Sequence, residues 1–386
     1  MKPESLKKTA PDNKTIMLLV AGAFLISRIV LILINGYFNG EISLETFLRD
    51  QNRFDATWYL FTMQEGYLPS PFGHDTGDAA NWAFFPLMPL VCRFLHKITG
   101  LEYILFVPVF NSLLFLISQF VIFKYMMKTR NDLYTAVAVL LFFNFGPYTF
   151  YFSSMYTESM FILFVSLFLW FMEEKRYLLM GICGLLASAT RNIGIFLVFA
   201  PFVMTIEEYL KKDGKKSFAD YIRHLFSDAD LVLGTCLVPA GLFSYIFYLY
   251  RLTGDGLAFL HIQRAWNETD DYSFIREFLG SFGAIYDARF YFAAWTILGM
   301  LALIFLLYKK RYSELVLCFI FMAIPLSVRM ISIPRYLIGS LIPVLAWAGM
   351  IKGLKFKALR IPVIIAILVL SYLTYKAWYL AMDIVT

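Results

Sequence analysis

The chain contains little charge and few of the residues that build metal or disulfide sites. Asp, Glu, Lys and Arg make up 16% of its 386 residues, whereas a soluble domain has about 25%. The four cysteines lie far apart and form no C-x-x-C pair: Cys92, Cys183, Cys236 and Cys318. This spacing argues against a zinc site, an iron–sulfur site and a disulfide framework. We therefore expect each cysteine to be a small buried hydrophobe.

Apolar residues dominate instead. They account for 60% of the chain, with 40 Phe and 24 Tyr, and the mean hydropathy is +0.66. A soluble fold could not bury so much apolar surface and still present a wettable exterior, so soluble, fibrous and disordered classes are excluded. We expect an all-α polytopic membrane protein. Its first helix is retained, because the apolar stretch that begins near Thr15 is longer than the core of a signal peptide.

A helix needs about 20 apolar residues to span a bilayer, and eleven stretches approach this pattern. The expected spans are Thr15–Tyr37, Glu102–Tyr125, Asp132–Phe152, Glu158–Met172, Tyr177–Thr190, Ile193–Leu210, Asp230–Arg251, Phe290–Tyr308, Ser313–Ile331, Tyr336–Ile351 and Ile361–Leu380. The stretch Trp82–Thr99 differs, because it contains two prolines together with Arg93, His96 and Lys97. We expect it to lie in the membrane interface as a helix that does not cross.

The distribution of positive charge predicts an orientation. If the N-terminus is cytoplasmic, the inner segments carry 21 of the 34 Lys and Arg and the outer segments carry 12, with Arg28 inside the first span. This asymmetry follows the positive-inside rule, so the net charge of +6 reflects topology and we expect no nucleic-acid partner. A single domain is expected over residues 1–386. Its two long extracytoplasmic loops, 38–101 and 252–289, are where a membrane enzyme would build its site.

Asp55 is the acidic residue that stands out in the first of these loops. It lies within the apolar and aromatic sequence R-F-D-A-T-W-Y, close to the expected membrane surface. Partial desolvation there would make its carboxylate a stronger base. Arg53, two residues earlier, could orient it or pair with it. A general base and a surface salt bridge both fit this spacing.

Several other ionisable residues lie at the expected outer ends of spans. Glu158, Arg191, Arg329 and Arg335 are the main ones. Charges at the membrane rim are costly and usually have partners or functions, and the planar guanidinium of arginine suits a phosphate. An ion pair between Glu158 and Arg191 is the structural alternative. Arg28 lies within a span, where a structural partner is expected.

Taken together, these segments resemble the PIG-V-like mannosyltransferases, a branch of the GT-C membrane glycosyltransferases. The resembling pieces are R-F-D-A-T-W-Y-L…E-G-Y (Arg53–Tyr67), A-F-F-P-L-M-P-L (Ala83–Leu90), Y-T-E-S (Tyr156–Ser159), A-T-R-N-I-G (Ala189–Gly194), H-I-Q-R-A-W (His261–Trp266) and P-R-Y-L…P (Pro334–Pro343). They occur in the order found in the family and cover most of the chain. The family usually has Trp before the aspartate, where this chain has Phe54.

The resemblance implies a GT-C-like fold and transfer of a sugar, typically mannose, from a polyprenyl-phosphate donor on the extracytoplasmic face. The family's motif aspartate corresponds to Asp55, which would act as general base in an inverting displacement. Candidate contacts to the donor phosphate or sugar are Arg191, Arg329, Arg335, His261 and Tyr336. Candidate contacts to the acceptor or sugar are Arg53, Trp58, Tyr59, Tyr67, Trp82, Glu158, Asn192, Gln263 and Trp266. No metal ion or other cofactor is expected.

The expected partners are therefore a polyprenyl-phosphate-sugar donor, a glycolipid or cell-envelope glycan acceptor, and the surrounding membrane lipids. A monomer in a bacterial plasma membrane is expected. A polytopic transporter or flippase is the main alternative, and a membrane scaffold without enzymatic activity is another. Transporters often contain internal repeats with broken helices in corresponding positions, and the two halves of this sequence show no clear repeat.

Overall fold

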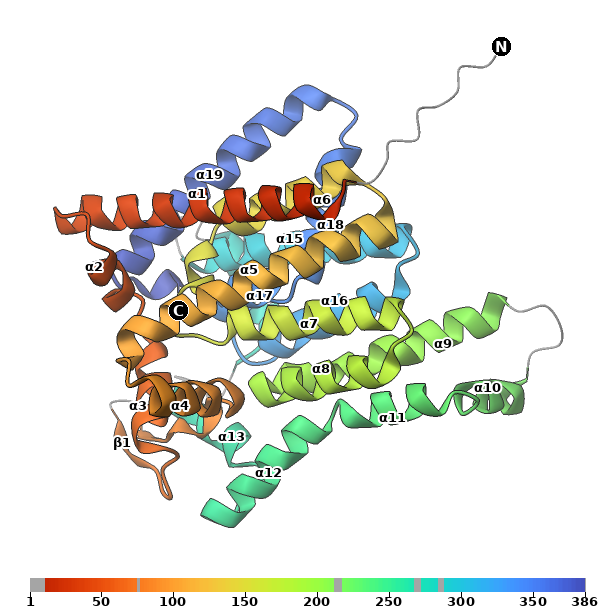
Figure 1. Cartoon of the computed structure of the whole chain (residues 1–386), viewed down its shortest axis with the longest axis horizontal. Coiled ribbons are helices and arrows are strands. Elements are labelled where there is room, and N and C mark those ends of the chain that lie inside the picture. Colours follow the sequence, from red (N-terminus) through yellow and green to blue (C-terminus); the bar gives the residue numbers. More distant parts are fainter. Residues whose placement is uncertain (1–10, 75–76, 212–216, 267–271, 284–287, 386) are drawn as a thin grey trace.

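The structure is a computed structural model that describes residues 11–74, 77–211, 217–266, 272–283 and 288–385. Long helices run side by side through the body of the molecule, and short elements gather at one end (Figure 1). The longer helices are α1 (Asn13–Asn39), α5 (Tyr103–Arg130), α6 (Leu133–Phe145), α7 (Glu158–Glu173), α8 (Tyr177–Thr190), α9 (Phe199–Lys211), α11 (Ala229–Leu237), α12 (Ala240–Thr253), α15 (Ala288–Tyr308), α16 (Tyr312–Leu326), α18 (Ile342–Gly353) and α19 (Arg360–Tyr379).

The short elements include most of the first long loop. They are α2 (Leu44–Arg49), α3 (Ala56–Glu65), β1 (Phe72–His74), β2 (Gly77–Ala79), η1 (Asn81–Ala83), α4 (Leu87–Thr99), η2 (Thr149–Phe152), η3 (Asn192–Val198), α10 (Phe218–Leu225), α13 (Ala258–His261), η4 (Ile262–Trp266), α14 (Phe274–Gly280), η5 (Ser281–Gly283), η6 (Met330–Ser332), α17 (Ile333–Gly339), η7 (Lys357–Leu359) and η8 (Asp383–Val385). Among the described residues the expected all-α fold is confirmed except for one antiparallel hairpin, in which Phe72 pairs with Ala79.

The molecule is a multi-pass integral membrane protein, but eleven spans are not supported. Six helical segments of the described chain are long and apolar enough to cross a bilayer, or seven if one bent pair is a single span. Expected spans at α6, α7, α8 and α16 form helices of only 13, 16, 14 and 15 residues. At 1.5 Å per residue even the longest of these is about 24 Å, short of a hydrocarbon core of about 30 Å.

The expected span Tyr336–Ile351 is broken in the middle. α17 and α18 meet at an angle of 77°, and Leu341 between them has a left-handed backbone with φ of 70°. Pro343 follows in the first turn of α18, where its missing N–H costs no hydrogen bond and its ring prevents a continuous helix. The break places the short helix α17, with Arg335 and Tyr336, at one end of the bundle.

Buried hydrogen bonds fix η2 to the first helix. Arg28 is 8% exposed, and its guanidinium donates to the hydroxyls of Ser153 and Thr149 at 2.5 and 2.9 Å. The prediction of a structural partner for Arg28 is therefore confirmed, and the partners are hydroxyl groups. Three of the four cysteines are buried, as expected. Cys236 is exposed instead, because its side chain lies on the outward-facing side of α11.

Two glycines allow α8 and α11 to pack with their backbones in contact. A Cβ on Gly181 would lie 2.2 Å from the carbonyl oxygen of Gly234, and one on Gly234 would lie 2.1 Å from that of Tyr177. Small residues are used in this way where membrane helices approach closely. This packing supports α8, whose C-terminal end carries Arg191.

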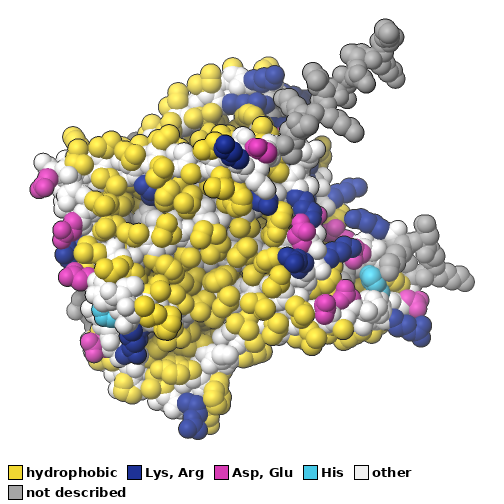
Figure 2. Space-filling model, in the orientation of Figure 1, with side chains coloured by type: hydrophobic (Ala, Val, Ile, Leu, Met, Phe, Trp, Pro, Cys, Tyr) yellow, Lys and Arg dark blue, Asp and Glu magenta, His cyan; other side chains and the backbone are white. Residues whose placement is uncertain are grey.

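The two ends of the bundle differ in charge. Ion pairs of Lys128 with Glu174 and of Lys352 with Asp132 tie together loops at the end away from α3 and α4. Figure 2 shows a group of Lys and Arg at this end, which we call the basic end. Short elements of the first loop form the opposite end (Figure 1). A cytoplasmic N-terminus stays a prediction.

Candidate functional site

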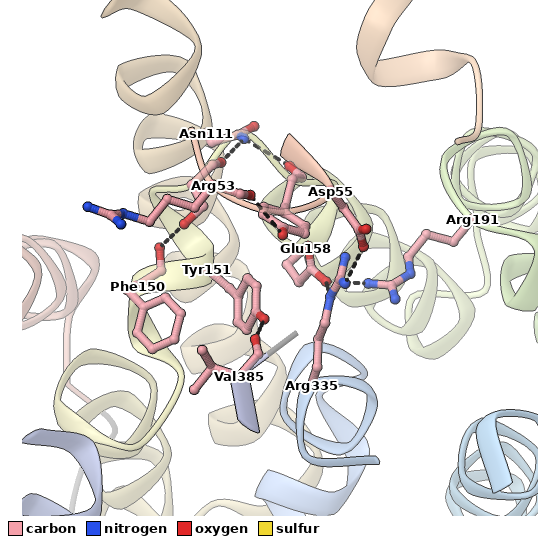
Figure 3. Close-up of polar contacts among 11 residues, drawn as sticks. Arg53, Asp55, Asn111, Phe150, Tyr151, Glu158, Arg191, Arg335 and Val385 are labelled. Carbon is pink, nitrogen blue, oxygen red and sulfur yellow. Dashed lines mark hydrogen bonds and ion pairs between the residues drawn. The ribbon is translucent and has the colours of Figure 1, made fainter. Parts of the chain in front are cut away.

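Four charged side chains meet at the end formed by the short elements (Figure 3). Glu158 Oε1 accepts from Arg335 Nε at 2.5 Å and from Arg191 Nη1 at 2.8 Å. Arg335 Nη1 also donates to Asp55 Oδ2 at 3.1 Å. These residues come from segments up to 280 positions apart in the sequence. We refer to Asp55, Glu158, Arg191 and Arg335 as the four-charge network.

The local backbone explains why these charges are tolerated where they are. Glu158 lies in the first turn of α7, and Asp55 is the residue before α3. Arg191 follows the last residue of α8. Carboxylates at helix N-termini and cations at helix C-termini interact favourably with the helix dipole. Only Arg335 lies inside its helix, α17, and it is held by both carboxylates.

The turn that presents Asp55 is strained and tightly held. Phe54 has a left-handed backbone with φ of 53°, which costs a residue with a side chain about 1–2 kcal/mol. Its ring packs 5.6 Å from that of Trp378 in α19. The hydroxyl of Tyr156 donates to the carbonyl oxygen of Arg53 at 3.1 Å. The chain thus keeps a costly conformation just before the carboxylate, as functional sites often do.

The loop before Glu158 is fixed from α5. Asn111 donates from Nδ2 to the carbonyl oxygens of Ser154 and Tyr156, at 2.6 and 2.9 Å. Ser159 donates to the carbonyl oxygen of Phe152 at 2.7 Å. The position of Glu158 is therefore set by buried hydrogen bonds on both sides of it, in addition to its ion pairs.

Aromatic rings cover the two arginines. The guanidinium of Arg335 lies 4.4 Å from the ring centre of Tyr156 and 5.1 Å from that of Tyr151. The guanidinium of Arg191 lies 4.5 Å from the ring centre of Tyr336. Such contacts stabilise a cation that has lost much of its water. Burial also raises the pKa of Tyr156 well above its usual value, so that its hydroxyl stays protonated and remains a donor.

The network is accessible at one residue. The side chain of Glu158 is 1% exposed, and those of Arg191 and Arg335 are 9% and 12% exposed, whereas that of Asp55 is 37% exposed. Two arginines and Glu158 carry a charge of +1 together, and Asp55 brings the total to zero. The carboxylate of Asp55 is therefore the part of the network that is open to the surroundings, and it balances a buried cation.

Arg53 does not pair with Asp55. Its guanidinium donates instead to Asp50, with Nη2 3.1 Å from Oδ1 and Nε 3.2 Å from the carbonyl oxygen. It also lies 5.3 Å from the ring centre of Tyr379. The expectation that Arg53 orients Asp55 is therefore wrong. Arg335, far away in sequence, pairs with Asp55, because the break between α17 and α18 brings it to this end.

Most of the expected aromatic contacts hold the first loop together. Tyr67 donates from its hydroxyl to the carbonyl oxygen of Phe84 at 2.5 Å, and Trp82 donates from Nε1 to that of Leu68 at 2.7 Å. Trp58 stacks on Phe84 with ring centres 5.8 Å apart. The polar side-chain atoms of Tyr67 and Trp82 are thus used within the protein.

Tyr59 lies closer to the network. It is buried, and its ring centre is 6.3 Å from that of Tyr156. Burial raises the pKa of Tyr59 to about 12, which keeps its hydroxyl protonated. Tyr59 is thus a second neutral phenol beside Tyr156.

The second long loop contributes no member to the four-charge network among its described residues. His261 Nδ1 lies 2.6 Å from Asp255 Oδ2, and this hydrogen bond lowers the pKa of Asp255.

Arg329 acts electrostatically on Glu277 of α14, whose pKa is raised by burial. Asn192 and Gln263 are half-buried in η3 and η4. Trp266 ends η4, and its side chain lies outside the described residues.

Sequence reasoning missed Tyr151 and Tyr156, the two rings against Arg335. Tyr156 lies two residues before Glu158, in the segment Y-T-E-S, and this position was the signal that could have identified it. No comparable signal points to Tyr151, which reaches the site because η2 is fixed to α1 through Arg28.

The described residues include no group of three or more His, Cys, Asp or Glu placed to hold a metal ion. Metal independence stays a prediction.

Comparison with known proteins gives a match in fold but none in sequence. No family model and no curated protein matches the sequence, so membership of the PIG-V-like family is not shown. The structure is similar to the crystal structure of the Archaeoglobus fulgidus oligosaccharyltransferase in complex with Zn and sulfate, with a TM-score of 0.53 at 13% identity. The match covers 94% of this chain and 53% of that protein, so the chain spans about half the length of the enzyme it resembles. This chain is a multi-pass membrane protein whose fold is similar to that of this archaeal oligosaccharyltransferase.

Proposed function

We propose that this protein is a membrane glycosyltransferase. It moves a sugar, with mannose as the first candidate, from a polyprenyl-phosphate donor to a glycolipid or cell-envelope glycan on the extracytoplasmic face of a bacterial plasma membrane. The observation that carries the proposal is the ion pair between the exposed carboxylate of Asp55 and the buried guanidinium of Arg335. Together they supply a base and a phosphate-binding cation about 3 Å apart, at the end of a GT-C-like bundle.

The charge balance of the network suits a donor with one negative charge. Arg191, Arg335 and Glu158 together leave a charge of +1 that Asp55 balances in the free protein. A phosphodiester at Arg335 would replace Asp55 as its anionic partner and free both carboxylate oxygens. Donor binding would thus prepare the base that the reaction needs.

The reaction follows from these positions. The acceptor hydroxyl oxygen attacks the anomeric carbon, and its proton goes to Asp55. The bond between the anomeric carbon and the phosphate oxygen breaks, and the leaving polyprenyl phosphate gains negative charge that Arg335 and Arg191 stabilise. A single displacement inverts the anomeric centre, so a β-linked donor yields an α-linkage. Glu158 acts as a positioning residue, because it holds both arginines without facing solvent.

A transfer assay tests the proposal. The full chain, purified in detergent, is incubated with radiolabelled polyprenyl-phosphate-mannose and a total lipid extract from the source organism. Wild type is compared with Asp55→Asn and with Asp78→Asn, which removes an exposed carboxylate elsewhere in the same loop. We expect a labelled glycolipid from wild type and Asp78→Asn only. Substantial turnover by Asp55→Asn would contradict the role of Asp55 as general base.

Transport is the second candidate function, because the 77° break between α17 and α18 is a feature that transporters use at their binding sites. The two functions differ in the fate of the donor. Donor that binds and crosses a vesicle membrane unchanged, with no labelled product, would favour a transporter or flippase. We also propose that transfer needs no metal ion, so EDTA should leave the rate unchanged.

A further inference from the structure

A large apolar cavity lies at the basic end, far from the four-charge network in the fold. Its volume is about 890 Å³, within the range of small-molecule and lipid sites. It lies between α6, α18 and α19, and Leu141, Phe145, Trp347, Ile364 and Leu368 are among its lining residues. We infer that this cavity binds an acyl chain of an anionic phospholipid, whose headgroup rests on the basic residues at its mouth.

The cavity exists because α19 packs closely on the bundle only through its C-terminal half. Its C-terminal half carries the buried Tyr375 and Trp378, and Ser371 donates to the carbonyl oxygen of Gly146 at 2.9 Å. Its N-terminal half is exposed, with Ile361 at 64% and Ile365 at 55%. In Figure 1 this half leads away from the other helices. A gap that widens in this way toward one membrane surface suits a lipid chain entering from the side.

Basic residues lie beside one end of the cavity, which we call its mouth. Lys352 lines the cavity, and Lys355, Lys357 and Arg360 follow it in the segment that joins the lining helices α18 and α19. The acidic Asp132, which also lines the cavity, pairs with Lys352 at 2.6 Å. The local charge is therefore positive. Basic pockets between membrane helices are binding sites for anionic lipid headgroups.

Arg360 connects the three helices that form the cavity. Its Nη2 donates to the carbonyl oxygen of Lys352 in α18 at 2.5 Å, and its guanidinium lies 5.2 Å from the ring centre of Tyr134 in α6. Its Nε has no acceptor among the described residues.

The source of selectivity is the headgroup. A lipid chain is as well solvated in the bilayer as in an apolar cavity, so transfer of the chain alone gains little. Attraction between the phosphate and the basic mouth is the term that can retain one lipid over another. The cavity should therefore prefer an anionic lipid over a zwitterionic lipid with identical chains.

Native mass spectrometry of the full chain in detergent tests this inference. The protein is titrated with dioleoylphosphatidylglycerol and, separately, with dioleoylphosphatidylcholine. We expect the anionic lipid to bind at least ten-fold more tightly. Lys355→Gln combined with Lys357→Gln should remove most of this preference, because both side chains are exposed in the segment that joins the lining helices α18 and α19. Lys309→Gln combined with Lys310→Gln is the matched control, since these lysines are also exposed but join α15 to α16, and neither of these helices lines the cavity.

A third variant tests the cavity itself. Ala138→Phe places a ring into it from α6 and should weaken binding of the anionic lipid while the mouth stays basic. Equal affinity for the two lipids, or an equal effect of the mouth and control variants, would overturn the inference. A stable dimer that Ala138→Phe dissociates would overturn it too, because a second copy of the chain would then cover the cavity. None of these readouts depends on sugar transfer.

Discussion

The two ends of this molecule each contain a glutamate held between two arginines. The two groups differ in the further partners that their charged side chains bind. The members are Glu158 with Arg191 and Arg335 at the site end, and Glu314 with Arg130 and Arg311 at the basic end. At the basic end, Tyr125 donates to Glu314 Oε1 at 3.4 Å, and Arg130 donates to the carbonyl oxygen of Leu345 at 3.2 Å. Neutral groups thus complete that network.

At the site end a carboxylate takes this place. Asp55 accepts from Arg335 and has a side chain that is 37% exposed, whereas that of Glu314 is 6% exposed. The comparison shows that a glutamate between two arginines can serve simply to hold helix ends together. A group that can act on a substrate arises only where one partner is accessible and exchangeable. The site end is therefore distinguished by Asp55 rather than by its arginines.

The largest effect on sugar transfer should come from replacing Asp55, the residue that distinguishes the site end. Asp55→Asn keeps the shape of the side chain but cannot take up the acceptor proton, so we expect transfer to fall by about 10²–10⁴-fold. The unfolding midpoint in an SDS titration should stay close to that of wild type, because Asp55 is partly exposed and its ion pair contributes little to stability. A large loss of stability would assign Asp55 a structural role like that of Glu314.

Replacing the central glutamate, Glu158 or Glu314, should lower the stability by a similar amount at the two ends. Glu158→Ala and Glu314→Ala each leave two largely buried arginines without their common partner, which costs about 3–5 kcal/mol. SDS titration of both variants measures this loss. Glu314→Ala should retain the turnover of wild type per folded molecule. A normal unfolding midpoint for Glu158→Ala would show that its arginines are not held as the structure indicates.

The arginines at the two ends should differ in their effect on the KM for the donor. Arg335→Lys keeps the charge but cannot bridge Glu158 and Asp55 through two different nitrogens, so the KM for the polyprenyl-phosphate donor should rise about ten-fold. Arg311→Lys makes the corresponding change at the basic end and should leave that KM unchanged. Donor titrations at saturating acceptor measure both. Equal effects of the two variants would remove the evidence for a phosphate site at Arg335.

The smallest effect should come from the tyrosines beside each network. Tyr156→Phe removes the hydroxyl that holds the carbonyl oxygen of Arg53 and should lower the free energy of unfolding by about 1 kcal/mol. Tyr125→Phe removes a longer hydrogen bond, 3.4 Å, and should cost less. Only Tyr156→Phe should also reduce turnover, because it loosens the turn before Asp55. Equal turnover in the two variants would show that the strained turn does not need this support.

Several features could be read from local sequence. Hydropathy identified the helical segments, since burial in lipid requires apolar side chains along a whole helix, and each expected span coincides with helix. Motif position singled out Asp55, Glu158, Arg191 and Arg335. The length of α6 was overestimated, because the apolar turn after Phe145 continues the pattern to Phe152. The bounds expected for α8 agree with the structure, but a helix of 14 residues is too short to cross a bilayer and was still counted as a span. The expected number of spans was too high for these reasons.

The sequence by itself determined that this is a helical membrane protein with its rare charges at helix ends, because apolar composition and charge position act through solvation, which each residue experiences locally. Only the tertiary structure decided which charges meet. Arg53 is two residues from Asp55 and pairs elsewhere, whereas Arg335 is 280 residues away and forms the ion pair. Such pairing depends on where the break between α17 and α18 and the strained turn at Phe54 direct the side chains, and these directions are set by packing among distant helices.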